Sequence, residues 1–341
     1  MSMDSNTNTL QTEGTKEIVL SCSDLKKQYP IRKGLLGKVV GQKHIVDNVS
    51  LEMEKGETLA IVGESGCGKT VLLRILLGIE EKTAGKIYFN GKSIDDMSAQ
   101  EINTMRAKIQ MIFQDTLGSL HPRMSIKESL EEPLILNGIK NAKEREKIIL
   151  SALEQVGLAP MYLERYPHQL SGGQRQRVVI ARCLVVTPEI IFADEPISAL
   201  DVSLQAQVIN MLMDLQEEYH LSMLLVAHDL AVVRQIANKI MIMYLGNIVE
   251  SAPAGEIYKN ARHPYTKVLL KAAPSISKGI ENGGFDVDLK PGDLPDPAAP
   301  PKGCPFCTRC IYADEKCIQE KPVPTMVSEG HMVMCHKFNQ M

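Results

Sequence analysis

Short apolar runs bounded by glycine or polar residues recur along the chain. Thr58–Val62 lies between two glycines, and Ile109–Phe113, Glu189–Asp194 and Leu221–Ala227 have the same character. Runs of this length without alternation are typical of strands that are buried on both faces of a parallel sheet. They therefore predict a buried sheet whose strands are separated by other elements.

A second set of segments alternates apolar and polar residues and predicts strands of a different kind. The alternating segments are Ile18–Tyr29 and Ile45–Met53. Lys86–Phe89 is a further short strand, and Ile240–Leu245 and Asn247–Glu250 resemble a last pair of strands. Asn90-Gly91 after the third segment predicts a hairpin turn, and Gly246 separates the last two. Between the first two segments, Ile31–Gly41 is basic and contains glycine, so we expect a solvated surface loop there.

Helical spacing of apolar residues appears in the middle of the chain. Ser125–Leu136 and Ala142–Val156 both place apolar residues three and four positions apart, and a further helix is expected from Ser198-Ala-Leu-Asp201 to about Tyr219. Residues 275–303 are rich in proline and glycine, which indicates a linker, and the polar residues 1–16 predict a disordered tail.

Composition narrows the class of protein. The 341 residues are 44% hydrophobic and 23% charged, which is ordinary for a globular protein. A net charge of −3 gives no reason to expect a nucleic-acid partner. No apolar stretch is long enough to cross a membrane, and no secretory signal is present at the start of the chain. The chain is long enough for one large unit and one or two small ones.

One motif follows the Thr58–Val62 run directly and precedes a predicted helix at Val71–Leu77. Its eight residues match the G-x-x-x-x-G-K-[ST] phosphate loop: Gly63, Glu64, Ser65, Gly66, Cys67, Gly68, Lys69 and Thr70. Glycines let the backbone approach phosphates, and backbone N–H groups at a helix start attract anions. We expect Lys69 to reach the β- and γ-phosphates of a nucleotide and Thr70 to bind Mg²⁺.

Polar residues also follow the other buried runs. Gln114 ends one, Asp194 and Glu195 end another, and His228 ends a third. The carboxyl ends of parallel strands share one edge of a sheet, so these side chains are expected to meet at the phosphate. Asp194 would complete the Mg²⁺ shell, since Mg²⁺ prefers oxygen ligands, and Glu195 would polarise the attacking water.

Cysteines crowd the last forty residues. Cys304, Cys310, Cys317 and Cys335 have C-x5-C-x6-C-x17-C spacing, with Cys307 between the first two. Four thiolates could hold zinc or an iron–sulfur cluster, or the thiols could stay reduced without metal. The local C-x2-C-x2-C spacing favours iron–sulfur. A cytosolic, reducing location fits better than a disulfide framework.

From residue 17 to about 250, the order of these motifs resembles that of the ATP-binding subunits of ABC transporters. The resemblance implies a P-loop ATPase of α/β class, with a RecA-like parallel-sheet core, an antiparallel β subdomain and an inserted helical subdomain over about 115–182. It implies catalytic roles for Gln114, Glu195 and His228, with Gln114 also near Mg²⁺. Tyr29 would stack on adenine, although an ordinary half-buried tyrosine is the alternative. Residues implied to bind the partner subunit's ATP are Ser171, Gly172, Gly173, Gln174 and Asp201.

Three further stretches resemble the oligopeptide/dipeptide branch of bacterial importers. They are Tyr29–Gly37, Phe113–Arg123 and His263-Pro-Tyr-Thr266, followed by an extension over 251–303 and the cysteine tail over 304–341. The resemblance implies the second of two paralogous ATPase subunits, pairing as a heterodimer at the cytoplasmic face of the membrane. It also implies two permease subunits, an extracytoplasmic solute-binding protein, and a [4Fe–4S] cluster on Cys304, Cys310, Cys317 and Cys335, with Cys307 spare. Alternatives are an importer of nickel chelates or another small solute, a soluble ABC ATPase that moves no solute, and a non-catalytic regulatory subunit. Lys69, Glu195 and His228 disfavour the last.

Overall fold

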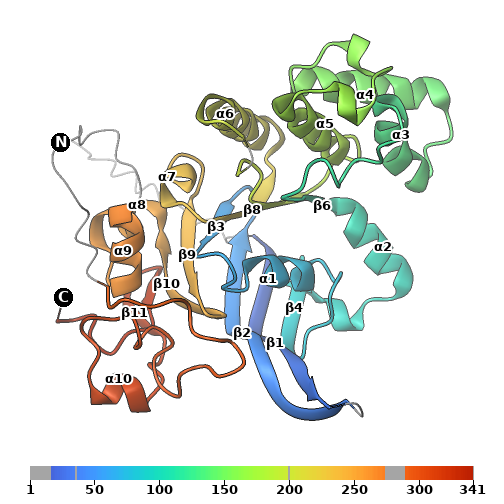
Figure 1. The fold of residues 1–341 in the computed structure, drawn as a ribbon. Coiled ribbons are helices and arrows are strands. Elements are labelled where there is room, and N and C mark those ends of the chain that lie inside the picture. Colours follow the sequence, from blue (N-terminus) through green and yellow to red (C-terminus); the bar gives the residue numbers. More distant parts are fainter. Residues whose placement is uncertain (1–16, 35–36, 199, 273–288, 341) are drawn as a thin grey trace, which may run out of the picture.

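A computed structural model of the chain describes residues 17–34, 37–198, 200–272 and 289–340 (Figure 1). The expected tail over 1–16 and the first part of the proline- and glycine-rich linker lie outside the described residues. The strands are β1 Ile18–Lys33, β2 Lys38–Glu54, β3 Thr58–Val62, β4 Ala84–Phe89, β5 Lys92–Ser93, β6 Ile109–Ile112, β7 Ile190–Asp194, β8 Ser222–Ala227, β9 Lys239–Tyr244, β10 Asn247–Pro253, β11 Thr325–Ser328 and β12 His331–Val333. The α-helices are α1 Lys69–Leu76, α2 Ala99–Lys108, α3 Ile126–Leu136, α4 Ala142–Gln155, α5 Gly172–Leu184, α6 Val202–Tyr219, α7 Leu230–Val233, α8 Ala254–Asn260, α9 Pro264–Ala272 and α10 Glu315–Gln319.

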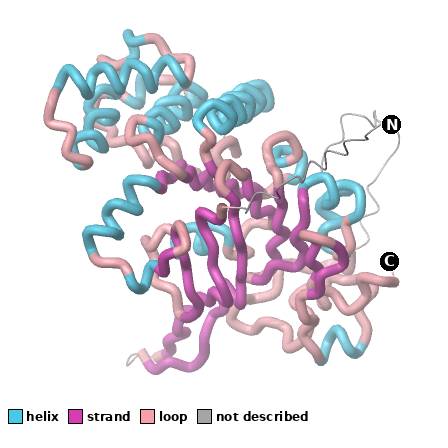
Figure 2. Tube along the Cα trace, turned by 180° about the vertical axis from the view of Figure 1, so that it is seen from behind, coloured by secondary structure: helices cyan, strands magenta, loops and turns pink. Residues whose placement is uncertain are grey.

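The large sheet has the strand order β11-β12-β10-β9-β3-β8-β7-β6, and β9, β3, β8, β7 and β6 run parallel. All residues of β3, β7 and β8 are buried, as their unbroken apolar sequences predict. Alternate residues of β3 face opposite cores: Leu59 and Ile61 pack with α1 and the antiparallel sheet, and Ala60 and Val62 pack with the helices behind. The strands therefore lie in the middle of the molecule, as Figure 2 shows.

The small sheet is antiparallel, with the order β2-β1-β4-β5. The expected hairpin at Asn90-Gly91 is confirmed, because both residues have positive φ and Phe89 pairs with Lys92. The expected surface loop at Ile31–Gly41 is wrong. β1 and β2 continue through this segment as a ribbon in which Ile31 pairs with Gly41 and Lys33 pairs with Lys38. The ribbon is held by backbone pairing, and both its faces are largely exposed. Its residues therefore need not alternate between apolar and polar, and the sequence pattern of a strand is lost before the strands end.

Helices α3, α4 and α5 form a lobe at one end of the large sheet (Figure 1). The two helices expected there are confirmed, and α3 begins at a capping box in which Ser125 and Glu128 satisfy each other's backbone N–H groups. Helix α2 was missed by the sequence analysis. It buries only Met105 and is otherwise polar, so its apolar periodicity is weak.

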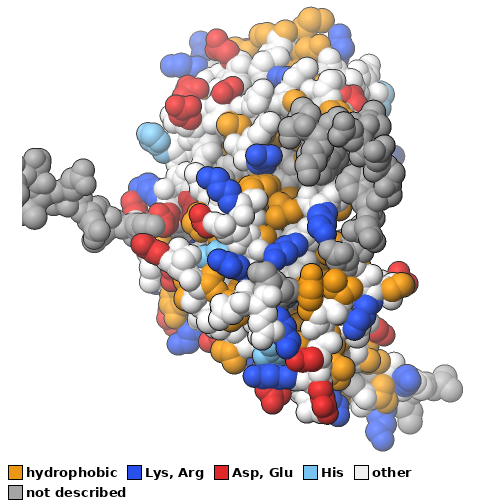
Figure 3. Space-filling view, turned by 90° about the vertical axis from the view of Figure 1, so that its left-hand side faces the viewer, with side chains coloured by type: hydrophobic (Ala, Val, Ile, Leu, Met, Phe, Trp, Pro, Cys, Tyr) orange, Lys and Arg blue, Asp and Glu red, His pale blue; other side chains and the backbone are white. Residues whose placement is uncertain are grey.

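The C-terminal segment joins the large sheet rather than standing apart from it. Strand β12 pairs with β10, where Glu250 lies opposite Val333. The fully buried Glu250 carboxylate accepts hydrogen bonds from the backbone N–H groups of Arg262 and His263 and lies 2.8 Å from His331 Nε2. Helices α8 and α9 lie beside β9 and β10 on the left of Figure 1. The face on that side carries basic, acidic and apolar side chains interspersed (Figure 3).

Candidate nucleotide-binding site

The loop from Gly63 to Thr70 joins β3 to α1, as the motif predicts. A Cβ atom at Gly63 would lie 2.2 Å from the carbonyl oxygen of Met243 in β9, so only glycine fits there. Gly68 caps α1 with a φ of 111°, a conformation that also requires glycine. The two glycines let the loop fold tightly against the sheet just before α1 begins.

Lys69 is buried and folds back over this loop. Its Nζ donates hydrogen bonds to the carbonyl oxygens of Gly63 at 2.6 Å and Glu64 at 3.0 Å. The ammonium group therefore lies inside the loop, in the position from which a lysine meets nucleotide phosphates.

Thr70 and Asp194 form the oxygen pair expected to hold Mg²⁺. The Thr70 hydroxyl donates to Asp194 Oδ1 at 3.2 Å. Burial raises the pKa of Asp194, the charge on Glu195 raises it further, and the Thr70 hydrogen bond opposes both. A bound cation would reverse this penalty. Mg²⁺ in nucleotide sites needs only one or two protein ligands besides phosphate, so these two residues suit it although the described chain has no group of three metal-binding side chains.

Glu195 collects the other two predicted side chains. Gln114 Nε2 donates to its Oε2 at 3.1 Å, and His228 Nδ1 lies 3.3 Å from the same oxygen. Glu195 has a positive φ of 45°, and its backbone N–H donates to the Val226 carbonyl of β8. The ends of β6, β7 and β8 thus bring Gln114, Glu195 and His228 together, as the parallel sheet predicts.

The residues expected to act on a partner's ATP open two helices. Ser171 caps α5 in a capping box with Gln174, and Asp201 caps α6 by accepting from the N–H of Leu204. Hydrogen bonds from Leu204 and Ser203 lower the pKa of Asp201. Among the described residues, no hydrogen bond joins Ser171 or Gly173 to the phosphate loop.

Tyr29 lies on β1 with 37% of its surface exposed. It pairs with Lys43, two residues from Ile45, whose carbonyl oxygen lies against Gly68. Its hydroxyl donates to Glu80, and the Lys27 ammonium lies 4.9 Å from the ring centre. Tyr29 therefore lies on β1, one strand away from the loop, and its ring is partly open to solvent.

The clustered cysteines surround one small cavity. Cys304, Cys307, Cys310, Cys317 and Cys335 all line it, together with His263. Burial raises the pKa of Cys304 to about 12 and that of Cys335 to about 11, and neighbouring thiolates raise both further. The expected iron–sulfur or zinc site thus has its thiols in one place, although no three of the described side chains are arranged around a single metal position.

Two residues next to the loop were missed by the sequence analysis. Tyr265, in the His263–Thr266 stretch, accepts a hydrogen bond at its hydroxyl from the backbone N–H of Glu64 at 2.9 Å. Arg309, between two of the cysteines, donates from Nη1 to Glu64 Oε2 at 2.8 Å. Both stretches were noticed, but no local pattern connects them with a loop about two hundred residues earlier.

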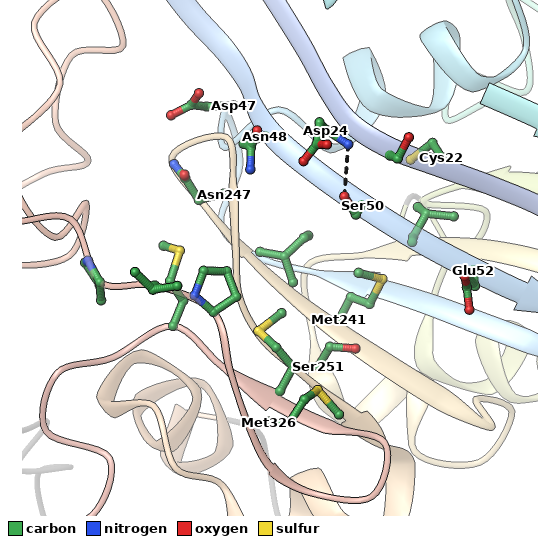
Figure 4. A pocket seen from close by; sticks show the side chains of 18 of the residues that line it. Cys22, Asp24, Asp47, Asn48, Ser50, Glu52, Met241, Asn247, Ser251 and Met326 are labelled. Carbon is green, nitrogen blue, oxygen red and sulfur yellow. Dashed lines mark hydrogen bonds between the residues drawn. The ribbon is translucent and has the colours of Figure 1, made fainter. Parts of the chain in front are cut away.

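A second cavity lies away from this site. It has a volume of about 780 Å³ and separates β1 and β2 from β9, β10 and the C-terminal segment. Figure 4 shows Asp47, Asn48 and Ser50 on its β2 wall, with Met241 and Met326 across from them. None of its lining residues belongs to the phosphate loop.

A phosphate loop on a parallel sheet, with Asp194, Glu195, Gln114 and His228 at the same edge, defines an ATP-binding cassette ATPase. Comparison with known proteins agrees. The ABC transporter family profile matches residues 46–198, and the profile for the C-terminal region of oligopeptide/dipeptide transporters matches residues 249–317. The chain belongs to the family of ABC transporter ATP-binding subunits and is an ATPase.

Curated relatives resemble it over nearly the whole length. The dipeptide transport ATP-binding protein DppF of Haemophilus influenzae is 46% identical, covering 93% of this chain and 96% of that protein. The oligopeptide transport ATP-binding protein AppF of Bacillus subtilis is 44% identical, covering 96% of this chain and 100% of that protein. A solved dimeric ATP-binding cassette in a post-hydrolysis state, bound to ADP and Pi, is 31% identical with a TM-score of 0.61, covering 69% of this chain and 98% of that one. No helix in the described ranges is both long and apolar enough to cross a membrane.

Proposed function

We propose that the chain hydrolyses ATP to power uptake of oligopeptides or dipeptides through partner permeases. The observation that carries this proposal is the likeness, over more than nine-tenths of the chain, to peptide transport ATP-binding proteins, which extends through the C-terminal region. In this proposal residues 17–250 are the ATPase domain, 251–303 its extension and linker, and 304–341 the cysteine tail.

The geometry supports one assignment of roles at the ATP site. Lys69 and the loop from Gly63 to Thr70 bind the phosphates. Thr70 and Asp194, with Gln114 as a third candidate, would hold a Mg²⁺ ion, which would offset the charge of the phosphates. Glu195 orients a water whose oxygen attacks the γ-phosphorus while the bond to the β-phosphate oxygen breaks. The water's proton passes to Glu195, and ADP leaves. His228 and Gln114 hold the Glu195 carboxylate in place at 3.3 and 3.1 Å.

The chain works as half of a head-to-tail dimer with a paralogous ATPase. Ser171, Gly172, Gly173, Gln174 and Asp201 complete the partner's ATP site in this proposal. Support comes from their position away from the chain's own loop, and from the dimeric form of the similar solved cassette. The chain alone should therefore hydrolyse ATP slowly, and the paralogue and permeases should raise the rate.

A groove between the sheet and the helical lobe supports the permease contact. It is lined by residues of α2, β6, α3 and α5, including Phe113 and Leu136, which are 41% and 80% exposed. A permease helix lying in this groove would be next to Gln114. That contact would hold the chain at the cytoplasmic face of the membrane. The peptide would be delivered on the other side by a solute-binding protein.

The cysteine tail binds a [4Fe–4S] cluster through Cys304, Cys310, Cys317 and Cys335 in this proposal. A zinc site would need four sulfurs about 3.8 Å apart, given bonds of about 2.3 Å. A cluster instead takes its thiolates from several cysteines around one position, and the gathering of the cysteines around one cavity supports such a site. Protein purified without oxygen should be brown with about four irons per chain. Serine at any of the four positions should remove the colour, while Cys307→Ser should keep it. Stoichiometric zinc without iron would contradict the assignment.

Pull-down of the tagged chain from a detergent extract of membranes, followed by peptide uptake in vesicles, tests the transport role. We expect two permeases, a paralogous ATPase and a peptide-binding protein to co-purify. Uptake of nickel chelates instead of peptides would change the solute, and recovery of ribosomes or DNA-repair proteins without permeases would refute transport.

A further inference from the structure

Glu64, the second residue of the phosphate loop, is fixed at three of its atoms. Its backbone N–H donates to the Tyr265 hydroxyl, and its carbonyl oxygen accepts from Lys69 Nζ. Its carboxylate accepts from Arg309 at 2.8 Å. Only the lysine belongs to the loop itself, so two of the three restraints come from the C-terminal part of the chain.

Arg309 is held in turn by the cysteine segment. Its backbone N–H donates to the Phe306 carbonyl, and its own carbonyl accepts from the N–H of Lys290. Its side chain is only 11% exposed, and its guanidinium carbon lies 5.9 Å from the centre of the Tyr244 ring. A long side chain that is packed and anchored at its base loses little freedom when it binds a carboxylate, so this contact is stronger than an exposed surface pair.

An aromatic cluster joins the same segment to Tyr265. Phe306 is 1% exposed and lies 5.4 Å from the Tyr265 ring and 5.1 Å from the Tyr244 ring, in an edge-on contact with the latter. Tyr244 and Tyr265 are themselves 4.7 Å apart. The Tyr265 ring, which positions its hydroxyl, thus packs against Phe306 of the cysteine segment and against Tyr244 at the end of β9.

The charge on Glu64 makes this arrangement matter for ATP. A carboxylate in the phosphate loop repels the nucleotide phosphates unless it is neutralised. Arg309 is the cation within hydrogen-bond distance of that carboxylate. We propose that the cysteine segment positions and neutralises the phosphate loop, and that Arg309 and Tyr265 are positioning residues for ATP binding.

This inference goes beyond the transport role and does not depend on which metal the cysteines hold. It makes a prediction of definite sign. Removing the Arg309 charge leaves Glu64 unpaired and repulsive, so ATP binding weakens. Removing the Glu64 charge as well removes the repulsion, so binding recovers.

The test is calorimetric titration of the full chain with MgATP. For Arg309→Met we expect the dissociation constant to rise about tenfold, the equivalent of one charge-assisted hydrogen bond. Arg309→Lys should recover part of this loss, and the double variant Glu64→Gln/Arg309→Met should bind within about threefold of Glu64→Gln alone. Tyr265→Phe, which keeps the ring, should weaken binding about fivefold. In the assembled transporter the KM for ATP should rise while kcat changes little.

Lys321→Met is the matched control. Lys321 also ties the C-terminal segment to the core, through a 2.5 Å ion pair with Asp47. Both residues line the cavity of about 780 Å³, and neither belongs to the phosphate loop. The Lys321→Met substitution should leave ATP binding unchanged. Equal weakening in Lys321→Met and Arg309→Met, unchanged binding in a folded Arg309→Met protein, or additive losses in the double variant would each overturn the inference.

Discussion

Replacement of Glu195 by glutamine tests the proposed chemistry most directly. The substitution keeps the size of a side chain that is 15% exposed, so the fold should be preserved. The amide can still accept from Gln114 Nε2 through its remaining oxygen, but it cannot take a proton from water. Positioned acid–base catalysis contributes about 10²–10⁴-fold in rate, or about 2.7–5.5 kcal/mol of activation free energy. ATP affinity should be unchanged, since no hydrogen bond joins Glu195 to Lys69 or Thr70 among the described residues.

The assay is phosphate release by the assembled transporter, with the partner's ATP site disabled so that only this site is read. Glu189→Gln is the control. Glu189 comes directly before β7, at the end of the strand opposite Glu195, and pairs with Lys108 at 2.5 Å. We expect Glu189→Gln to hydrolyse ATP at the normal rate. A Glu195→Gln transporter that retained more than about a tenth of the rate would refute the assignment.

Three further predictions follow from buried groups. Asp194→Asn should raise the melting temperature of the nucleotide-free chain by a few degrees, because burial disfavours the carboxylate, and a lower melting temperature would contradict this. The same substitution should abolish the stabilisation that MgATP gives the normal chain. Cys22 and Cys183 should resist iodoacetamide at pH 8 in the folded protein, because burial raises the pKa of each thiol to about 12. Rapid labelling of either thiol, read by mass spectrometry, would contradict this burial. Burial lowers the pKa of His263 from 6.5 to about 3, so the stability that the neutral ring contributes is complete above pH 6.5 and is lost as the pH falls toward 3, by about 1.4 kcal/mol per pH unit. The free energy of unfolding in urea should therefore depend less steeply on pH in His263→Gln, and identical slopes would refute this.

The sequence predicts the part of the fold that uses unbroken apolar runs. β3, β6, β7 and β8 are confirmed within one or two residues at each end, because a strand buried on both faces needs apolar residues throughout. The meeting of Gln114, Glu195 and His228 was also predictable, since parallel strands present the residues at their carboxyl ends on one edge.

Elements with exposed faces were harder to predict. The ends of β1 and β2 are held by backbone pairing, which leaves no side-chain pattern, so the basic segment has the sequence of a loop although it forms a ribbon. Helix α2 lacks an apolar face, but its capping box of Ser98 and Glu101 was a signal that could have located it. The contact of Arg309 with Glu64 spans 245 positions of the chain, and only the folded backbone brings the two together.

The pairing of β12 with β10 has a consequence for how the protein is made. Until β12 is synthesised, β10 is an open edge of the large sheet, and His331 follows Pro253 by 78 positions. At about 5–20 residues per second, a ribosome leaves that edge uncovered for about 4–16 s. Glu250 in the middle of β10 and Pro253 at its end are residues that discourage a foreign strand from adding there. The carboxylate that His331 later contacts would thus protect the nascent chain from aggregation before it serves the finished one.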